Sequence, residues 1–174
     1  RITVGRFMVG HELSAFERLR GLSGVPADGF RVDAHALAYR FVPAKELADV
    51  GPDRATPAFF RQLEETVLAM HDRDIAHLEL RSGGNILVTD AATPLLIDFQ
   101  SHLKSGYLPR FLKRALYTFD LGSIYKHWSH RHPDSLGAER RAVLARVTGW
   151  RRFWWWRPYF WRKRPQDHTR SAGK

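Results

Sequence analysis

Residues 77–88 read His-Leu-Glu-Leu-Arg-Ser-Gly-Gly-Asn-Ile-Leu-Val, and residues 95–100 read Leu-Leu-Ile-Asp-Phe-Gln. These stretches place an acid (Glu79), an amide (Asn85) and a second acid (Asp98) on two short apolar strands joined by a tight turn. Such an arrangement suits a metal ion held against phosphate oxygens. Phosphoryl transfer needs mainly positioning and charge neutralisation from a protein, so a few oxygen ligands in a fixed frame are enough.

The composition is that of one domain with a sizeable core, because 44% of the 174 residues are hydrophobic. The chain has no cysteine, which excludes disulfides and a thiolate zinc site. It has no run of eighteen apolar residues, so we expect no segment to span a bilayer. The net charge of +10 favours an anionic partner.

Apolar spacing predicts an α+β chain. Val9, Phe16 and Leu19 recur at helical spacing within residues 8–21, and a second apolar stripe runs through residues 57–73. The other expected elements are strands at Phe30–Asp33 and Ala36–Val42, a hairpin of Asn85–Val88 and Leu95–Ile97, and helices at Pro109–Tyr117, Phe119–Trp128 and Leu136–Val147.

With these elements in order, residues 7–130 resemble the protein-kinase-like superfamily, most nearly the small bacterial lipopolysaccharide (Kdo/WaaP-type) kinases. The resemblance rests on several spacings together, including the thirteen residues from Asn85 to Asp98. It implies an α+β, protein-kinase-like fold with three parts. These are a truncated N-lobe with helix C, two strands and the hinge (1–43), a mostly helical C-lobe with a catalytic β-hairpin (44–148), and a basic tail (149–174).

The resemblance also implies ATP and Mg²⁺ as cofactors. Asn85 and Asp98 match the residues that hold magnesium across the nucleotide phosphates. Glu79 stands where the catalytic acid would orient or deprotonate an acceptor hydroxyl, and Arg81 matches the cation that reaches the transferred phosphate. An ordinary turn would also explain Asn85 and Asp98 taken alone, and a solvated loop would explain Glu79 and Arg81.

The remaining matches are supporting residues. By resemblance, His77 packs near Phe99, and Asp120 braces the catalytic loop from below. Glu12 matches the helix-C glutamate, and Tyr39 and Phe41 belong to the strand and hinge against which adenine docks. For Glu12 a solvated helix face is the alternative, and for Asp120 a helix N-cap.

The chain also departs from the family pattern. Glu79 replaces an aspartate, and one extra methylene can misplace a carboxylate enough to cost roughly 10²-fold in rate. Gln100 follows Asp98-Phe99 in place of glycine. No glycine-rich phosphate loop and no lysine precede Lys45, so the partner expected for Glu12 is missing. Either upstream residues belong to the protein, which we favour, or the chain is a degenerate kinase.

The tail is the second unusual feature. Residues 150–174 hold eight Lys or Arg and one acid. Tryptophan prefers the headgroup region and cations are drawn to anionic lipid, so we expect peripheral docking on a membrane. The residues expected there are Trp150, Arg151, Arg152, Trp154, Trp155, Trp156, Arg157 and Trp161. Packing of these aromatics onto the C-lobe and nucleic-acid binding by stacking remain alternatives.

The leading hypothesis is a cytoplasmic, ATP-dependent phosphotransferase docked peripherally on the inner face of the membrane. Its acceptor would be a sugar or lipid-linked hydroxyl, or a simplified protein substrate. A basic run of Lys104, Arg110, Lys113 and Arg114 could bind an acidic acceptor. The rivals are a pseudokinase that binds without turnover and a nucleic-acid-binding protein that uses the tail. Five further histidines show no metal-ligand spacing and are expected to pack or face solvent: His71, His102, His127, His130 and His132.

Overall fold

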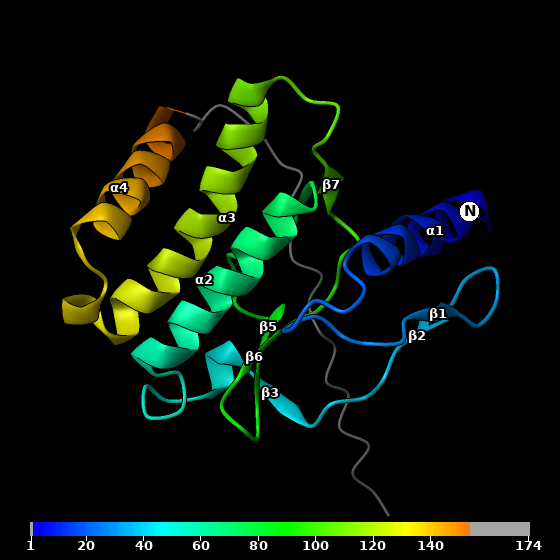
Figure 1. Ribbon diagram of the computed structural model, residues 1–174, viewed down its shortest axis with the longest axis horizontal. Helices are drawn as coiled ribbons and strands as arrows, with labels where there is room; N and C mark the ends of the chain where they lie inside the picture. Colours follow the sequence, from blue (N-terminus) through cyan, green and yellow to red (C-terminus); the bar gives the residue numbers. More distant parts are fainter. Residues whose placement is uncertain (1, 154–174) are drawn as a thin grey trace, which may run out of the picture.

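The computed structural model describes residues 2–153, with side chains from residue 8 to residue 150 (Figure 1). Within these residues four helices combine with small antiparallel sheets, which confirms the α+β prediction. The helices are α1 (Ile2–Arg18), α2 (Pro57–Asp72), α3 (Arg110–Arg131) and α4 (Ala138–Phe153). The strands are β1 (Phe30–Arg31), β2 (Leu37–Ala38), β3 (Ala44–Glu46), β4 (Ile75–Ala76), β5 (Ile86–Thr89), β6 (Pro94–Leu96) and β7 (Leu103–Lys104).

Helix α2 is the centre of the helical body. The Thr56 hydroxyl caps its first turn by accepting the Phe59 N–H, and Pro57 fits there because that turn needs no donor at its start. Its predicted apolar stripe is buried except at Leu68, which is 45% exposed, and Phe60 stacks on Trp128 of α3 at 5.6 Å between ring centroids. Helix α3 packs between α2 and α4, so these three helices lie side by side in the order α2, α3, α4 (Figure 1).

Two small sheets carry the loops of interest. Strand β5 lies between β3 and β6, and β4 pairs with β7. The β5–β6 register sets Ile86 opposite Leu96, and the Ile97 N–H donates to the Asn85 carbonyl at 3.1 Å, one residue beyond the strands. The hairpin therefore places Asn85 opposite Ile97, the residue before Asp98, where the backbone pairing ends.

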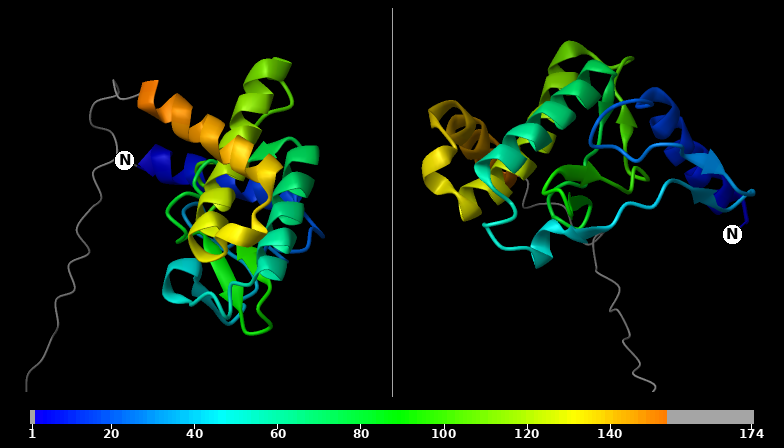
Figure 2. Two further views of the ribbon diagram at one scale, coloured as in Figure 1. Left: turned by 90° about the vertical axis from the view of Figure 1, so that its left-hand side faces the viewer. Right: turned by 60° about the horizontal axis from the view of Figure 1, so that its bottom comes forward.

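Helix α1 and the β1–β2 pair lie to one side of the helical body (Figure 2, right). The end of α1 is tied to the end of α2, because the Arg18 side chain donates to the Arg73 carbonyl and Arg73 donates back to the Arg20 carbonyl. The helix begins at Ile2, six residues before the predicted start, and ends at Arg18.

Two sequence predictions of secondary structure differ from the structure. The expected strand Ala36–Val42 shrinks to β2, and residues 39–43 belong to no strand, since β1 is only two residues long and offers no further partner. The two helices expected on either side of Thr118 are one helix, α3. The Thr118 hydroxyl donates to the Arg114 carbonyl four residues earlier, so the polar side chain is satisfied without a break.

Candidate active site

The loop that follows β4 is held from below by one carboxylate. Asp120 lies in the middle of α3 with 1% of its surface exposed. Its Oδ2 accepts the His77 N–H and its Oδ1 accepts the Leu78 N–H, both at 2.8 Å. Leu78 has a positive φ of 68°, a costly conformation outside glycine, and the paired hydrogen bonds hold it there. Asp120 is therefore no helix N-cap.

His71 completes the support under the loop. Its Nε2–H donates to Asp120 Oδ2 at 3.0 Å, and its ring stacks on Tyr117 at 3.9 Å. The Tyr117 hydroxyl donates to the His71 carbonyl at 2.7 Å. This role of His71 was not predicted from the sequence, although the residue continues the buried stripe of Leu63 and Val67 at four-residue spacing. A polar side chain at such a position needs a buried partner.

A column of rings connects the loop with α1. The His77 ring lies 4.8 Å from Phe99, Phe99 lies 5.5 Å from Phe16 on α1, and Phe16 lies 5.5 Å from Tyr39. The His77 Nε2–H donates to the Ile97 carbonyl at 3.0 Å. Burial lowers the pKa of His77, so its imidazole is neutral and the column carries no charge of its own. The column sets the position of α1 against the segment after β6.

Asn85 and Asp98 lie at the adjoining ends of β5 and β6. The Asn85 amide nitrogen donates to the Glu79 carbonyl at 3.3 Å, so the amide oxygen is the atom left to bind a ligand. Asp98 has a positive φ of 60°, and its Oδ1 accepts the Gln100 N–H at 3.3 Å. Both side chains are half-buried. Strained backbone of this kind is concentrated at functional sites.

Glu12 faces the same place from α1. The residue is 6% exposed, which excludes the solvated helix face. Burial raises the pKa of Glu12, and the nearby Asp98 carboxylate raises it further, while hydrogen bonds from the Phe99 backbone and the Gln100 side chain lower it. Burial, then Glu12 and Asp98, also raise the pKa of Tyr39. The site therefore gathers negative charge that is costly without a cation.

No described Lys or Arg, from residue 8 to residue 150, forms an ion pair with Glu12. Asn85 and Asp98 at adjoining strand ends, with Glu12 near Asp98, offer oxygens of two carboxylates and one amide, and such ligands suit a hard cation such as Mg²⁺. Over the same span no three His, Cys, Asp or Glu side chains form a cluster that could hold a metal. Magnesium bound through one or two carboxylates with its remaining ligands from phosphates and water would fit this donor set.

Glu79 and Arg81 occupy the loop between its braced start and Asn85. Glu79 is half-buried and Arg81 is exposed. The loop turns through Gly83, whose φ is 82° and where a Cβ would lie 3.2 Å from the His127 ring. The His127 Nε2–H donates to the Leu80 carbonyl at 3.2 Å, and burial lowers the pKa of His127 to about 4. The floor of the loop is thus a neutral imidazole from α3.

A third neutral histidine, His102, holds the segment after Asp98. The His102 Nδ1–H donates to the Phe99 carbonyl at 2.7 Å, and its ring lies 4.0 Å from His11 of α1. Burial lowers the pKa of His102 to about 4. His102 and His127 are both buried against backbone carbonyls, in agreement with the prediction that they pack or face solvent.

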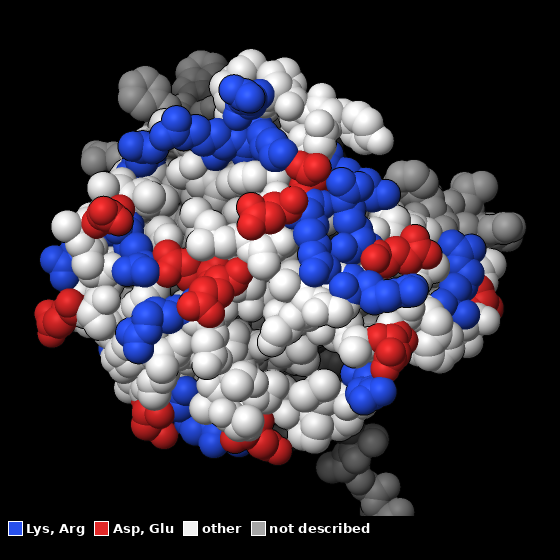
Figure 3. Space-filling model, viewed as in Figure 1, with Lys and Arg blue, Asp and Glu red and all other residues white. Residues whose placement is uncertain are grey.

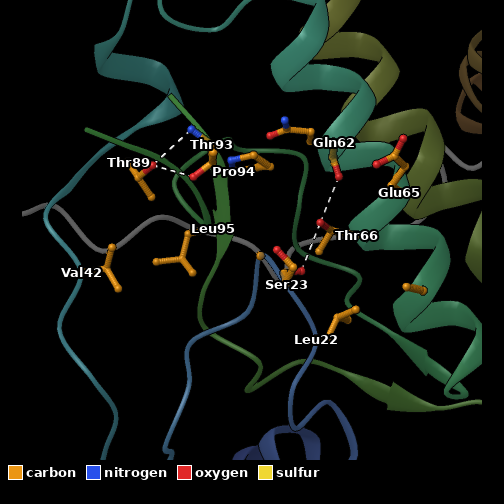
Figure 4. Close-up of a pocket in the computed structure, with 12 residues that line it drawn as sticks. Leu22, Ser23, Val42, Gln62, Glu65, Thr66, Thr89, Thr93, Pro94 and Leu95 are labelled. Carbon is orange, nitrogen blue, oxygen red and sulfur yellow. Dashed lines mark hydrogen bonds between the residues drawn. The ribbon is translucent and has the colours of Figure 1, made fainter. Parts of the chain in front are cut away.

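The structure separates the two residues expected at an adenine site. Tyr39 joins the ring column, but Phe41 is 83% exposed. A cavity of about 660 Å³ opens beside the neighbouring Val42, between α2 and the β5–β6 hairpin (Figure 4). Thr66 points into it and donates to the Gln62 carbonyl at 3.0 Å. None of the predicted site residues lines this cavity.

Most of the predicted membrane residues lie outside the described part of the chain. Trp154, Trp155, Trp156, Arg157 and Trp161 follow its last residue, and the side chains of Arg151 and Arg152 are also outside. Trp150 is exposed at the end of α4, with its ring 5.8 Å from Phe119. None of the helices in residues 2–153 is long and apolar enough to cross a bilayer.

No protein-family model matches the chain, and no curated protein matches it in sequence. Among solved structures it is similar to the crystal structure of a Rio2 kinase–ADP/Mg²⁺–phosphoaspartate complex from Chaetomium thermophilum. The TM-score is 0.60 at 15% sequence identity, and the match covers 86% of this chain. The chain spans 55% of the length of that structure. The similarity confirms the protein-kinase-like fold.

Proposed function

We propose that this chain carries the phosphotransfer site of an ATP-dependent kinase. The observation that carries the proposal is the placement of Glu12 and Asp98 as close, largely unexposed carboxylates with no described cation between them. The two carboxylates repel each other in the free protein, and a bound cation would remove that repulsion. The kinase-like fold, together with the ADP and Mg²⁺ of the Rio2 complex, supports a nucleotide–metal complex as the source of that cation.

Each residue of the loop then has a distinct part. Asn85 and Asp98 would hold Mg²⁺, which when bound neutralises the phosphate charge and aligns the nucleotide. Glu79 orients an acceptor hydroxyl and accepts its proton, and Arg81 offsets charge on the transferred group. Asp120 and His77 act indirectly by fixing the backbone from which these side chains project.

For the acceptor we propose a sugar or lipid-linked hydroxyl at the cytoplasmic surface of a membrane. The resemblance to lipopolysaccharide kinases favours such an acceptor, as does the short interval of 22 residues from Asp98 to Asp120. That interval leaves little chain for a peptide-binding platform. The basic residues Lys104, Arg110 and Arg114 are all exposed and suit an acidic headgroup.

Nucleotide binding and turnover can be tested separately. In titration calorimetry with ATP and Mg²⁺, Asp98→Asn should weaken the magnesium-dependent affinity by at least about tenfold, since one charged ligand is lost. Asparagine tolerates the positive φ at this position, so folding is preserved. Asp90→Asn, in the turn of the same hairpin, is the matched control and should bind as the parent does.

Turnover is measured as ATP hydrolysis or phosphate transfer by the full chain. Glu79→Gln should lower the rate by roughly 10²-fold or more with little change in nucleotide affinity. If nucleotide binds but neither Glu79→Gln nor Asp98→Asn changes any rate, the enzymatic proposal is wrong.

A pseudokinase is the second candidate, and two observations favour it. Glu79 stands in place of aspartate, and Glu12 has no cationic partner from residue 8 to residue 150. Magnesium-dependent nucleotide binding without measurable transfer, unaffected by Glu79→Gln, would identify this function.

A further inference from the structure

Six exposed apolar side chains gather around one end of the molecule, on β7, the start of α3 and the end of α4. They are Leu103, Tyr107, Phe111, Leu112, Phe119 and Trp150, here called the docking face. Tyr107 is 93% exposed and Phe111 is 70% exposed, although both are large rings. Contact between Phe119 and Trp150 joins α3 to α4 within this face. Single exposed apolar residues are ordinary, but a group of this size marks an interaction surface.

The segment that carries most of the docking face is basic, and the acid beside it, Asp74, is already paired with Lys113 and Arg18. Residues 99–119 contain four Lys or Arg and no Asp or Glu. Lys113 is held by Asp74, whereas Lys104, Arg110 and Arg114 are exposed without an ion pair to any described residue. Blue side chains lie over the N-terminal end of α3 at the top of the view (Figure 3). An apolar protein surface with cations around it complements an anionic lipid bilayer, which has an apolar interior and negatively charged headgroups.

We propose that the docking face binds the surface of an anionic lipid bilayer. Rings and leucines would enter the headgroup region while Arg110 and Arg114 meet lipid phosphates. The cationic tail is a poor occupant because residues 150–174 carry a net positive charge, and a second copy would repel for the same reason. Leu103 and Leu112 contribute apolar area without a stacking ring, which suits lipid better than bases.

The docking face adjoins the candidate active site. Strand β7 pairs with β4 so that Leu103 lies opposite Ala76, and the loop with Glu79 and Arg81 follows directly. Bilayer contact through this face would bring headgroup hydroxyls toward that loop. This presentation of the acceptor rests on the proposed function, whereas bilayer binding itself does not.

Flotation of the full 174-residue chain with lipid vesicles tests the proposal without nucleotide. The vesicles are phosphatidylcholine alone or phosphatidylcholine with about one third phosphatidylglycerol, in low and high salt. Tyr107→Ser combined with Phe111→Ser should reduce partitioning to the anionic vesicles at least tenfold, as should Arg110→Gln combined with Arg114→Gln. These side chains are exposed, so the melting temperature should not change.

The matched control is Phe30→Ser combined with Val32→Ser, which removes two similarly exposed apolar side chains at the β1–β2 end. This control should partition like the parent chain. A parent chain that fails to float with anionic vesicles overturns the proposal, as does a control that loses as much binding as the docking-face variant. So does a docking-face variant that floats normally while Trp154→Ser, Trp155→Ser and Trp156→Ser together abolish flotation, because the tail alone would then dock.

Binding of a single-stranded RNA oligonucleotide that needs Arg110 and Arg114, without flotation, would also overturn it. The magnesium–ATP affinity, measured without vesicles, reports on the proposed function independently. Failure of one measurement therefore leaves the other intact.

Discussion

Asp120 and Glu12 are both buried carboxylates of the candidate site, yet their surroundings are opposite. Asp120 accepts two backbone N–H groups and one imidazole N–H, so its charge is satisfied within the fold. Burial and then the nearby Asp98 carboxylate raise the pKa of Glu12. The first environment stabilises a charge and the second penalises one. We infer that the surroundings of Asp120 are structural and that the surroundings of Glu12 and Asp98 are arranged for a ligand.

The largest expected effect is at Asp120. Asp120→Ala leaves the N–H groups of His77 and Leu78 without acceptors and removes the partner of His71. The free energy of unfolding should fall by about 3–5 kcal/mol, measured in urea. Asp72→Ala, an exposed carboxylate at the end of α2, should change it by less than about 0.5 kcal/mol. A small loss at Asp120 would mean that the loop is not held from below.

Acid should weaken the same region through His127. Its pKa is about 4 in the fold and near 6.5 when unfolded, so the unfolded chain binds more protons between these values. The stabilisation is fully present above pH 6.5 and is lost as the pH falls toward 4. It amounts to roughly 3 kcal/mol. His127→Gln should remove that part of the pH dependence in unfolding curves from about pH 7 to about pH 4. If the free energy of unfolding of His127→Gln falls with pH as steeply as that of the parent chain, the prediction is wrong.

At Glu12 the pH dependence of stability has the opposite sign to that at His127. Because its pKa is raised in the fold, ionisation opposes folding, and the penalty is fully present at neutral pH. Glu12→Gln should therefore raise the free energy of unfolding of the ligand-free chain, which a higher melting temperature at neutral pH would show. The gain should shrink as the pH falls through the ordinary range of a glutamate carboxyl, because the folded and the unfolded chain then both bind the proton.

The same variant should weaken magnesium-dependent nucleotide binding. Asp120→Asn would destabilise the chain by contrast, because an amide N–H₂ would face backbone donors. Destabilisation by Glu12→Gln at neutral pH would abolish the distinction between the two carboxylates.

The smallest expected effect is at Asp74, whose ion pairs join the end of α1 to α3. Asp74 pairs with Arg18 at the end of α1 and with Lys113 of α3. The Lys113 hydrogen bond in particular lowers the pKa of Asp74. Asp74→Asn keeps the positive φ but removes the charge, and the melting temperature should fall by only about 1–3 °C. Added salt should shrink the difference, and a larger, salt-insensitive loss would show that the tie is more than electrostatic.

How far the sequence predicted the fold depends on how local each element is. The hairpin of β5 and β6 was predicted to within one residue, because alternating apolar residues around a short turn determine it locally. Strand β2 was predicted too long, since a strand extends only as far as its partner, and β1 is short. Short strands β4 and β7 were missed for the same reason: their pairing joins residues nearly thirty positions apart.

The candidate site divides in the same way. The spacing of Asn85 and Asp98 could be read from the sequence because both lie on one hairpin. Glu12 could equally have been a solvated residue, and only the packing of α1 against Phe99 through Phe16 buries it. His71 was missed because its partner, Asp120, is 49 residues away.

The amino-acid sequence alone determined the local framework: an apolar hairpin with oxygen-bearing side chains at its ends, helices with one apolar face, and a positive charge concentrated near the C-terminus. These properties depend on periodicity and composition, which neighbouring residues share. Only the tertiary structure decided that one buried carboxylate accepts backbone and imidazole donors while the other lies beside a second carboxylate, and that exposed apolar side chains of three elements lie toward one end of the molecule (Figure 1). The energy of a charge or an apolar group depends on what surrounds it in space, and distant parts of the chain supply those surroundings.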